Sequence, residues 1–170
     1  IRRRQRQMCI RDRLIMNFSE FAESRKSVRG FLDKPLPKEV IEEIISGAKW
    51  APSSYNTQTW HIHAVSGDAL EKIRKGNVDE TMAGKPHVRD FAYKEDYEGE
   101  HRQKQIDVAI QLFEAMGIKR DDKEKRMDWM LRGFRQFDAP VSLVLTYDKY
   151  LEPAGITHFG LGALAYGIIL

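Results

Sequence analysis

The chain has 170 residues, 42% of them hydrophobic and 31% charged, a composition typical of a globular protein, and no apolar run approaches the roughly 20 residues needed to span a membrane. Its single cysteine, Cys9, excludes an intrachain disulfide and a cysteine-based zinc site. The net charge is +3, but residues 1–15 hold six arginines and one aspartate, +5, which leaves −2 for the rest. A basic nucleic-acid-binding face is therefore not expected on the folded part.

The basic segment 1–15 precedes the first helix signal, which begins at Met16. An arginine arm for nucleic acid and a transit peptide are two functional interpretations, although the segment lacks serine and contains Asp12. We expect residues 1–15 to be a non-native or disordered extension and residues 16–170 to form one domain. Deleting the residues before Met16 tests this, because the protein should remain soluble without them.

The first half of the chain predicts helices around one strand. Asn17 with Glu20 predicts a capping box that opens a helix ending near Ser24. The stretch "KPLPKEVIEEIISGAKWAP" predicts a second helix, with Pro37 at its first position. Residues 60–66 predict a strand, and an Asp68 capping box predicts a short helix, "ALEKIRKG", after it.

The second half begins with a long polar connection from 77 to 99. Helices are predicted around 106–116 and over 123–134, and the second carries an apolar stripe that predicts core contacts: Met127, Met130, Leu131 and Phe134. Residues 140–147 predict a second strand, and "ITHFGLGALAYGIIL" predicts a final uncharged helix. Two strands do not make a stable sheet alone, so we expect missing strands or a partner chain.

Two polar clusters could form a ligand site. Arg25, Ser27 and Arg29 share one face if the segment is extended, and two guanidiniums beside a hydroxyl suit a phosphate group. The alternative is that these cations complement the end of the preceding helix. The second cluster lies in "APSSYNTQTWHIHAV", where Asn56 and Gln58 carry the donors and acceptors that could read a flat heterocycle, or else form an ordinary turn.

A hydrolase and a metal site are less well supported. Ser53 or Ser54 with His61 or His63 could suggest a nucleophile and a base, but there is no Gly-x-Ser-x-Gly elbow and no acid evident to orient a histidine. The two histidines share a strand face without a third ligand, so no metal site is expected. We name no catalytic residue.

Together the clusters resemble the nitroreductase family of flavin enzymes. "SRKSVRGF" is similar to the family's Arg-Arg-Ser-x-Arg-x-Phe signature, with Lys26 in place of the second basic residue. "APSSYNTQTWHI" is similar to Pro-Ser-x-x-Asn-x-Gln-Pro-Trp, with Thr59 replacing the proline. "MLRGFRQFDAPVSLVLTYD" looks like the branch close to nitrobenzoate reductases. The resemblance covers the chain from Met16 onward.

The resemblance implies an α+β fold with a central, mostly antiparallel sheet flanked by helices, in an intertwined cytoplasmic homodimer that binds FMN at the subunit interface. It implies that Arg25, Lys26 and Ser27 hold the phosphate and ribityl end and that Arg29 lies near the pyrimidine edge. The other subunit would line the ring with Pro52, Ser53, Ser54, Asn56 and Gln58. The implied reaction is ping-pong reduction of nitroaromatics, quinones or similar acceptors by NAD(P)H.

Family members continue beyond the final predicted helix into a further strand and helix. We therefore expect the 170 residues to be a C-terminally truncated form that binds FMN weakly or not at all. A yellow, dimeric preparation that oxidises NAD(P)H would contradict this expectation. The alternatives to an enzyme are a flavin-binding sensor or carrier without turnover and an inactive fragment.

Overall fold

The computed structural model describes residues 17–86, 88–89, 96–151 and 155–169. The basic segment 1–15 and the expected start at Met16 lie outside these residues. Helix α2 spans Phe18–Ser24, and the predicted capping box is confirmed: Asn17 Oδ1 accepts from the Glu20 amide, and Glu20 Oε2 accepts from the Asn17 amide. Reciprocal bonds of this kind satisfy two amides that a helix start leaves unpaired.

The first strand lies between two helices. Helix α3 spans Lys38–Ala48, and Pro37 is its N-cap rather than its first residue. After the 3₁₀ turn η1, Ser54–Asn56, strand β1 spans His61–Ser66. Helix α4 then runs over Gly67–Met82, so the prediction of a short helix followed by a connection from 77 was wrong. The Asp68 capping box was wrong as well, because Ser66 is the N-cap and makes no side-chain bond there.

The second half holds three more helices and one strand. Helix α5 spans Gly99–Ala115, and α6 spans Lys123–Phe134. Asp122 starts α6, because its carboxylate accepts from the Lys125 amide at 3.0 Å, a bond that lowers the pKa of Asp122. The remaining elements are η2 at Gln136–Asp138, β2 at Val141–Thr146, η3 at Lys149–Leu151 and α7 at Gly155–Ile169.

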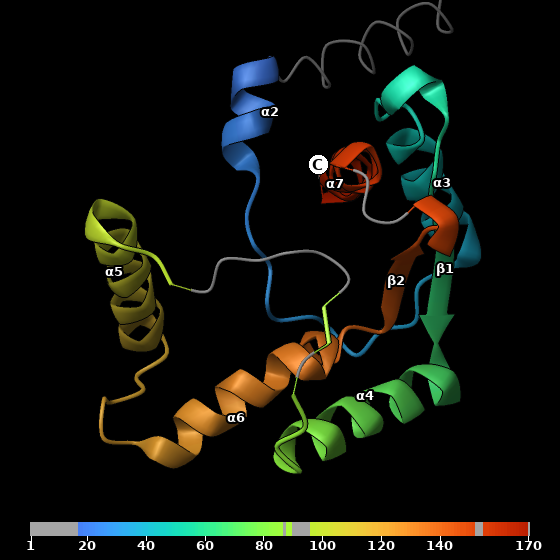
Figure 1. The fold of residues 1–170 in the computed structure, drawn as a ribbon. Coiled ribbons are helices and arrows are strands. Elements are labelled where there is room, and N and C mark those ends of the chain that lie inside the picture. The colour runs from blue at the N-terminus through green and yellow to red at the C-terminus, as the bar shows by residue number, and fades with distance from the viewer. Residues whose placement is uncertain (1–16, 87, 90–95, 152–154, 170) are drawn as a thin grey trace, which may run out of the picture.

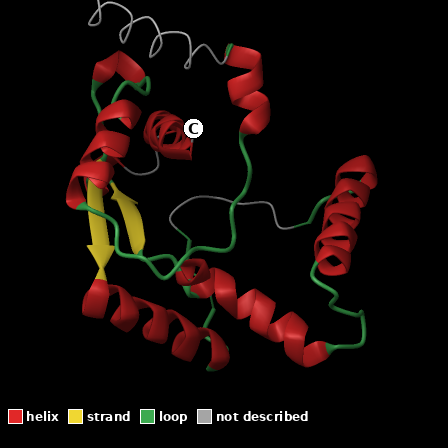
Figure 2. Cartoon of the chain, turned by 180° about the vertical axis from the view of Figure 1, so that it is seen from behind, coloured by secondary structure: helices red, strands yellow, loops and turns green. Residues whose placement is uncertain are grey.

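The sheet of the described residues has two antiparallel strands, with His61 opposite Thr146 and Ser66 opposite Val141. Helix α4 packs against both strands and against α6, while α3 packs against α7 (Figure 1). Figure 2 shows from behind that α2 and α5 stand away from the rest. This α+β arrangement agrees with the expected fold class. Among the described helices, none has the length and apolar character needed to cross a membrane.

The described residues bury a small core, made mainly by α3, α4 and α7: Ala48, Leu70, Ala139, Leu161 and Leu164. The α6 stripe contributes less than expected. Met127 and Met130 are each 46% exposed, because α6 packs mainly on α4 and the η2 turn and nothing described covers its outer face. The prediction that both methionines belong to the core was therefore wrong.

Helices α3 and α7 pack closely at Gly167. A Cβ on Gly167 would lie 3.3 Å from Ala48 Cα, which leaves no room for a larger side chain. Gly167→Leu is therefore expected to reduce the free energy of unfolding by about 1–3 kcal/mol, measured by urea denaturation. Gly162→Leu on the same helix is the control, because a Cβ on Gly162 would meet nothing within 4 Å. Equal stability of the two variants would contradict this packing.

Candidate functional site

The basic cluster lies on an exposed segment that follows α2. Arg25 caps this helix with extended backbone, at φ −60° and ψ 129°, and residues 25–31 are all exposed. None of Arg25, Lys26 and Arg29 forms an ion pair with a carboxylate of the described residues. Their charges are available to an anion.

Arg29 is held on the body of the protein by residues that the sequence did not reveal. Arg132 of α6 donates from Nη2 to the Arg29 carbonyl at 3.1 Å. The guanidinium carbon of Arg29 lies 6.0 Å from the centre of the Phe137 ring, within the range of cation–π attraction. The Phe137 ring packs on Trp129, with 5.9 Å between their centres. The end of α6 and the η2 turn therefore form the platform for the basic segment.

The second cluster is a tight loop before β1. The backbone amide of Gln58 donates to Ser53 Oγ at 2.9 Å, and its side-chain Nε2 donates to Asn56 Oδ1 at 3.1 Å. Tyr55, Asn56 and Gln58 all have positive φ, between 47° and 55°, which non-glycine residues seldom adopt. The local hydrogen bonds are those expected of an ordinary turn. The positive φ values are a backbone strain that clusters at functional sites. No hydrogen bond or ion pair of the described residues joins this loop to the basic segment.

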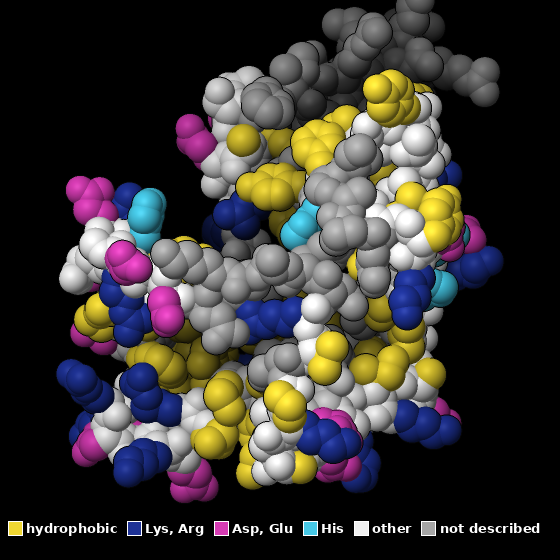
Figure 3. All heavy atoms as spheres, in the orientation of Figure 1, with side chains coloured by type: hydrophobic (Ala, Val, Ile, Leu, Met, Phe, Trp, Pro, Cys, Tyr) yellow, Lys and Arg dark blue, Asp and Glu magenta, His cyan; other side chains and the backbone are white. Residues whose placement is uncertain are grey.

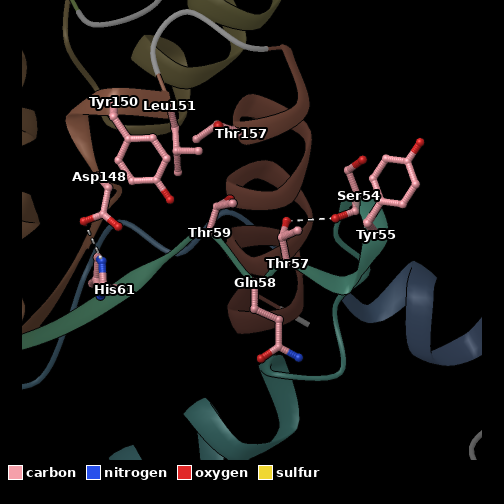
Figure 4. Close-up of a pocket in the computed structure, with 10 residues that line it drawn as sticks. All are labelled: Ser54, Tyr55, Thr57, Gln58, Thr59, His61, Asp148, Tyr150, Leu151 and Thr157. Atoms are coloured by element: carbon pink, nitrogen blue, oxygen red, sulfur yellow. Dashed lines mark hydrogen bonds and ion pairs between the residues drawn. The ribbon is translucent and has the colours of Figure 1, made fainter.

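A cavity of ≈ 340 Å³ opens between this loop and the start of α7 (Figure 4). Ser54 and Gln58 line it, together with Tyr150 and Leu151 from η3. Thr157, which is 1% exposed, also lines it, and its hydroxyl has no hydrogen-bond partner among the described residues. The loop is backed by α7, because a Cβ on Gly160 would lie 3.6 Å from Ser53 Cβ. Helix α7 thus supports the second cluster directly.

The histidines on β1 have partners across the sheet. His61 Nε2 lies 3.3 Å from Asp148 Oδ1, and His63 Nε2 lies 3.0 Å from Thr146 Oγ1. The expectation that no acid orients a histidine was therefore wrong for His61. Neither histidine bonds a serine hydroxyl in the described part of the chain, so the nucleophile and base of a hydrolase are not assembled. Among these residues no group of three His, Cys, Asp or Glu side chains could hold a metal ion.

A larger cavity, of ≈ 1000 Å³, lies between α5 and the start of α6. Apolar residues, among them Ile106 and Phe113, line it together with the basic residues Arg102, Lys119 and Arg126. Figure 3 shows apolar side chains at the left of the molecule, where α5 and the start of α6 lie, with basic side chains beside them. No residue of the two predicted clusters lines this cavity.

Comparison with known proteins gives one family. A model described as the Nitroreductase family matches residues 22–165. A nitrobenzene nitroreductase of Ectopseudomonas oleovorans is 37% identical over 139 residues, covering 80% of this chain and 61% of the relative. A chloronitrobenzene nitroreductase of Comamonas testosteroni has the same identity and coverage. The chain thus spans about three fifths of the length of these relatives.

The fold is similar to that of a solved structure. The FMN-dependent nitroreductase NfnB from Mycobacterium smegmatis, solved in complex with NADPH, superposes with a TM-score of 0.78 at 26% identity. The superposition covers 90% of this chain and 70% of that one. The match includes both predicted clusters, since residues 22–165 contain the basic segment and the loop before β1.

Proposed function

The chain belongs to the Nitroreductase family, and from this premise we propose that it is part of an FMN-dependent oxidoreductase that uses NAD(P)H to reduce nitroaromatics, quinones or similar acceptors. The observation that carries the proposal is the exposed basic segment, which is attached to the α6–η2 platform through Arg29. The kinetic order is proposed to be ping-pong: NAD(P)H donates its hydride first, and the acceptor is reduced second.

The residues present fit FMN. Arg25 and Lys26 have no ion-pair partner among the described residues, and with the Ser27 hydroxyl they suit the phosphate and ribityl end. Arg29 is proposed to lie at the pyrimidine edge, where its charge favours the negative charge that a reduced ring carries. Bound FMN supplies the redox chemistry, and the protein supplies position and electrostatics.

We also propose that the protein is a homodimer in which the loop before β1 faces the FMN of the other subunit. Pro52, Ser53, Ser54, Asn56 and Gln58 would then line the ring. Support comes from apolar side chains that α3, α7 and the residues beside them leave exposed: Ile44 (41%), Trp50 (90%), Phe159 (58%) and Tyr166 (60%). Large apolar side chains left exposed on two helices that pack together are the kind of surface that a partner chain covers.

FMN titration followed by NAD(P)H oxidation tests the function. The protein is expected to quench FMN fluorescence on binding, with titration extended to millimolar protein so that weak binding is detected. Oxidation of NADH or NADPH should accelerate when 4-nitrobenzoate is added, and initial-rate plots should give the parallel lines of a ping-pong order. Binding without such turnover would instead support a flavin sensor or carrier. Because the 170 residues alone are expected to bind FMN weakly or not at all, the proposal is refuted if a form extended beyond residue 170 also fails to bind FMN.

A further inference from the structure

Helix α4 carries a buried arginine, Arg74, which hydrogen-bonds the backbone on both sides of the turn 136–138. Arg74 is only 8% exposed, and its Nε donates to the Arg135 carbonyl at 2.9 Å while its Nη2 donates to the Ala139 carbonyl. Its Nη1 pairs with Glu71 one helical turn earlier. Burying an arginine is unfavourable unless its donors are satisfied, and here the planar fork is matched to two carbonyls that flank one turn.

The turn between those carbonyls is strained. Gln136, Phe137 and Asp138 have φ values of 50°, 53° and 58°, a left-handed run without glycine. Such a run is disfavoured for L-residues and persists only where its surroundings hold it. Asn77, also on α4, donates to the Phe134 carbonyl at 3.1 Å, so side chains of α4 hydrogen-bond the backbone before and after the turn. Removing the hydrogen bonds of Arg74 should let the turn relax toward ordinary φ values.

The strained turn determines where Phe137 lies, and Phe137 lies under Arg29. In Figure 1 the segment that follows α2 passes the end of α6 where η2 begins, with α4 beneath it. The chain of contacts therefore runs from Arg74 through the turn to Phe137 and then to the guanidinium of Arg29. Arg132 adds a second attachment through the Arg29 carbonyl.

We propose that Arg74 is a positioning residue for the flavin site: it fixes the left-handed turn 136–138 and thereby holds Arg29 in place. This proposal rests on the proposed role of Arg29 beside the flavin ring. Arg74 touches neither the acceptor nor the cofactor in this scheme, and it acts only through Phe137. A lysine in its place keeps the charge but cannot span both carbonyls, so Arg74→Lys isolates the positioning function.

The first test needs no flavin. Trypsin can cleave after Arg29 and after Lys26, and only the first of these sites is attached to the platform. Arg74→Lys is expected to raise the rate of Arg29–Gly30 cleavage, relative to Lys26–Ser27, several-fold by mass spectrometry. Phe137→Leu, which leaves the hydrogen bonds from α4 to the turn intact, should also raise this cleavage ratio. Lys75→Arg, an exposed basic exchange on the same helix, is the matched control. An unchanged ratio in both variants would overturn the proposal.

The second test is a double-mutant cycle on the reduction potential of bound FMN. Arg29→Gln should make the potential more negative, Arg74→Lys should shift it in the same direction, and the double variant should match Arg29→Gln alone. Additive shifts would mean that Arg74 acts independently of Arg29, which overturns the proposal. If Arg29→Gln leaves the potential unchanged, the proposed role of Arg29 fails, and the cleavage ratio still decides whether Arg74 holds the segment.

Discussion

Replacing Arg25 and Lys26 together by glutamine is expected to weaken FMN binding by about a hundred-fold or more, since a hydrogen bond to a charged group contributes about 1.5–3 kcal/mol. Both side chains are exposed on the segment after α2, and neither pairs with a carboxylate of the described residues. Their loss should therefore leave folding unaffected and remove only contacts to the ligand. The dissociation constant from fluorescence titration, measured at fixed ionic strength, checks this.

Riboflavin separates phosphate binding from ring binding, because it lacks the phosphate. Its affinity should be nearly equal in the native protein and in the Arg25→Gln, Lys26→Gln variant. The matched control replaces Lys34 and Lys49, which removes the same charge from exposed positions outside the proposed site. A loss of FMN affinity in the control as large as in the variant would indicate general attraction of an anion rather than a phosphate site.

The elements that could be predicted are those determined by residues that are neighbours in the sequence. The capping box at Asn17 and the periodicity of α3 depend on neighbouring residues, and both helices form, with α3 starting one residue later than expected. Helix α4 was predicted too short because "GNVDETM" has weak apolar periodicity. It continues to Met82 through contacts outside the helix, including the bond from Asn77 to the Phe134 carbonyl. Such a contact with a residue 57 positions away leaves no trace in a local pattern.

The candidate site was only partly accessible to sequence reasoning. The residue types of the two clusters indicate a ligand for both, but the platform under Arg29 depends on Arg132 and Phe137, more than a hundred residues further on. The left-handed turn that positions Phe137 contains no glycine, so its residue types do not predict its positive φ values. One signal was available: Arg74 follows Leu70 by four residues, which places a cation on the buried face of α4.

The support of the loop before β1 by α7 leads to the largest expected effect on stability. Leu164 is fully buried on α7, and this helix packs on α3 and on η1. Leu164→Ala removes buried apolar atoms and leaves a cavity, so the free energy of unfolding should fall by about 2–5 kcal/mol. The urea midpoint, followed by circular dichroism, measures this fall.

Val108→Ala is the control for Leu164→Ala, because Val108 is 64% exposed on α5, and its truncation should change stability by no more than about 0.5 kcal/mol.

The two variants also test whether FMN binding depends on the support of the loop before β1 by α7. A helix α7 that loses Leu164 supports the loop at Ser53 and Thr59 less firmly, because Gly160 lies against both residues one helical turn away. FMN affinity should therefore fall in Leu164→Ala even under conditions where the protein remains folded, and an affinity equal to that of Val108→Ala would show that the loop does not depend on α7.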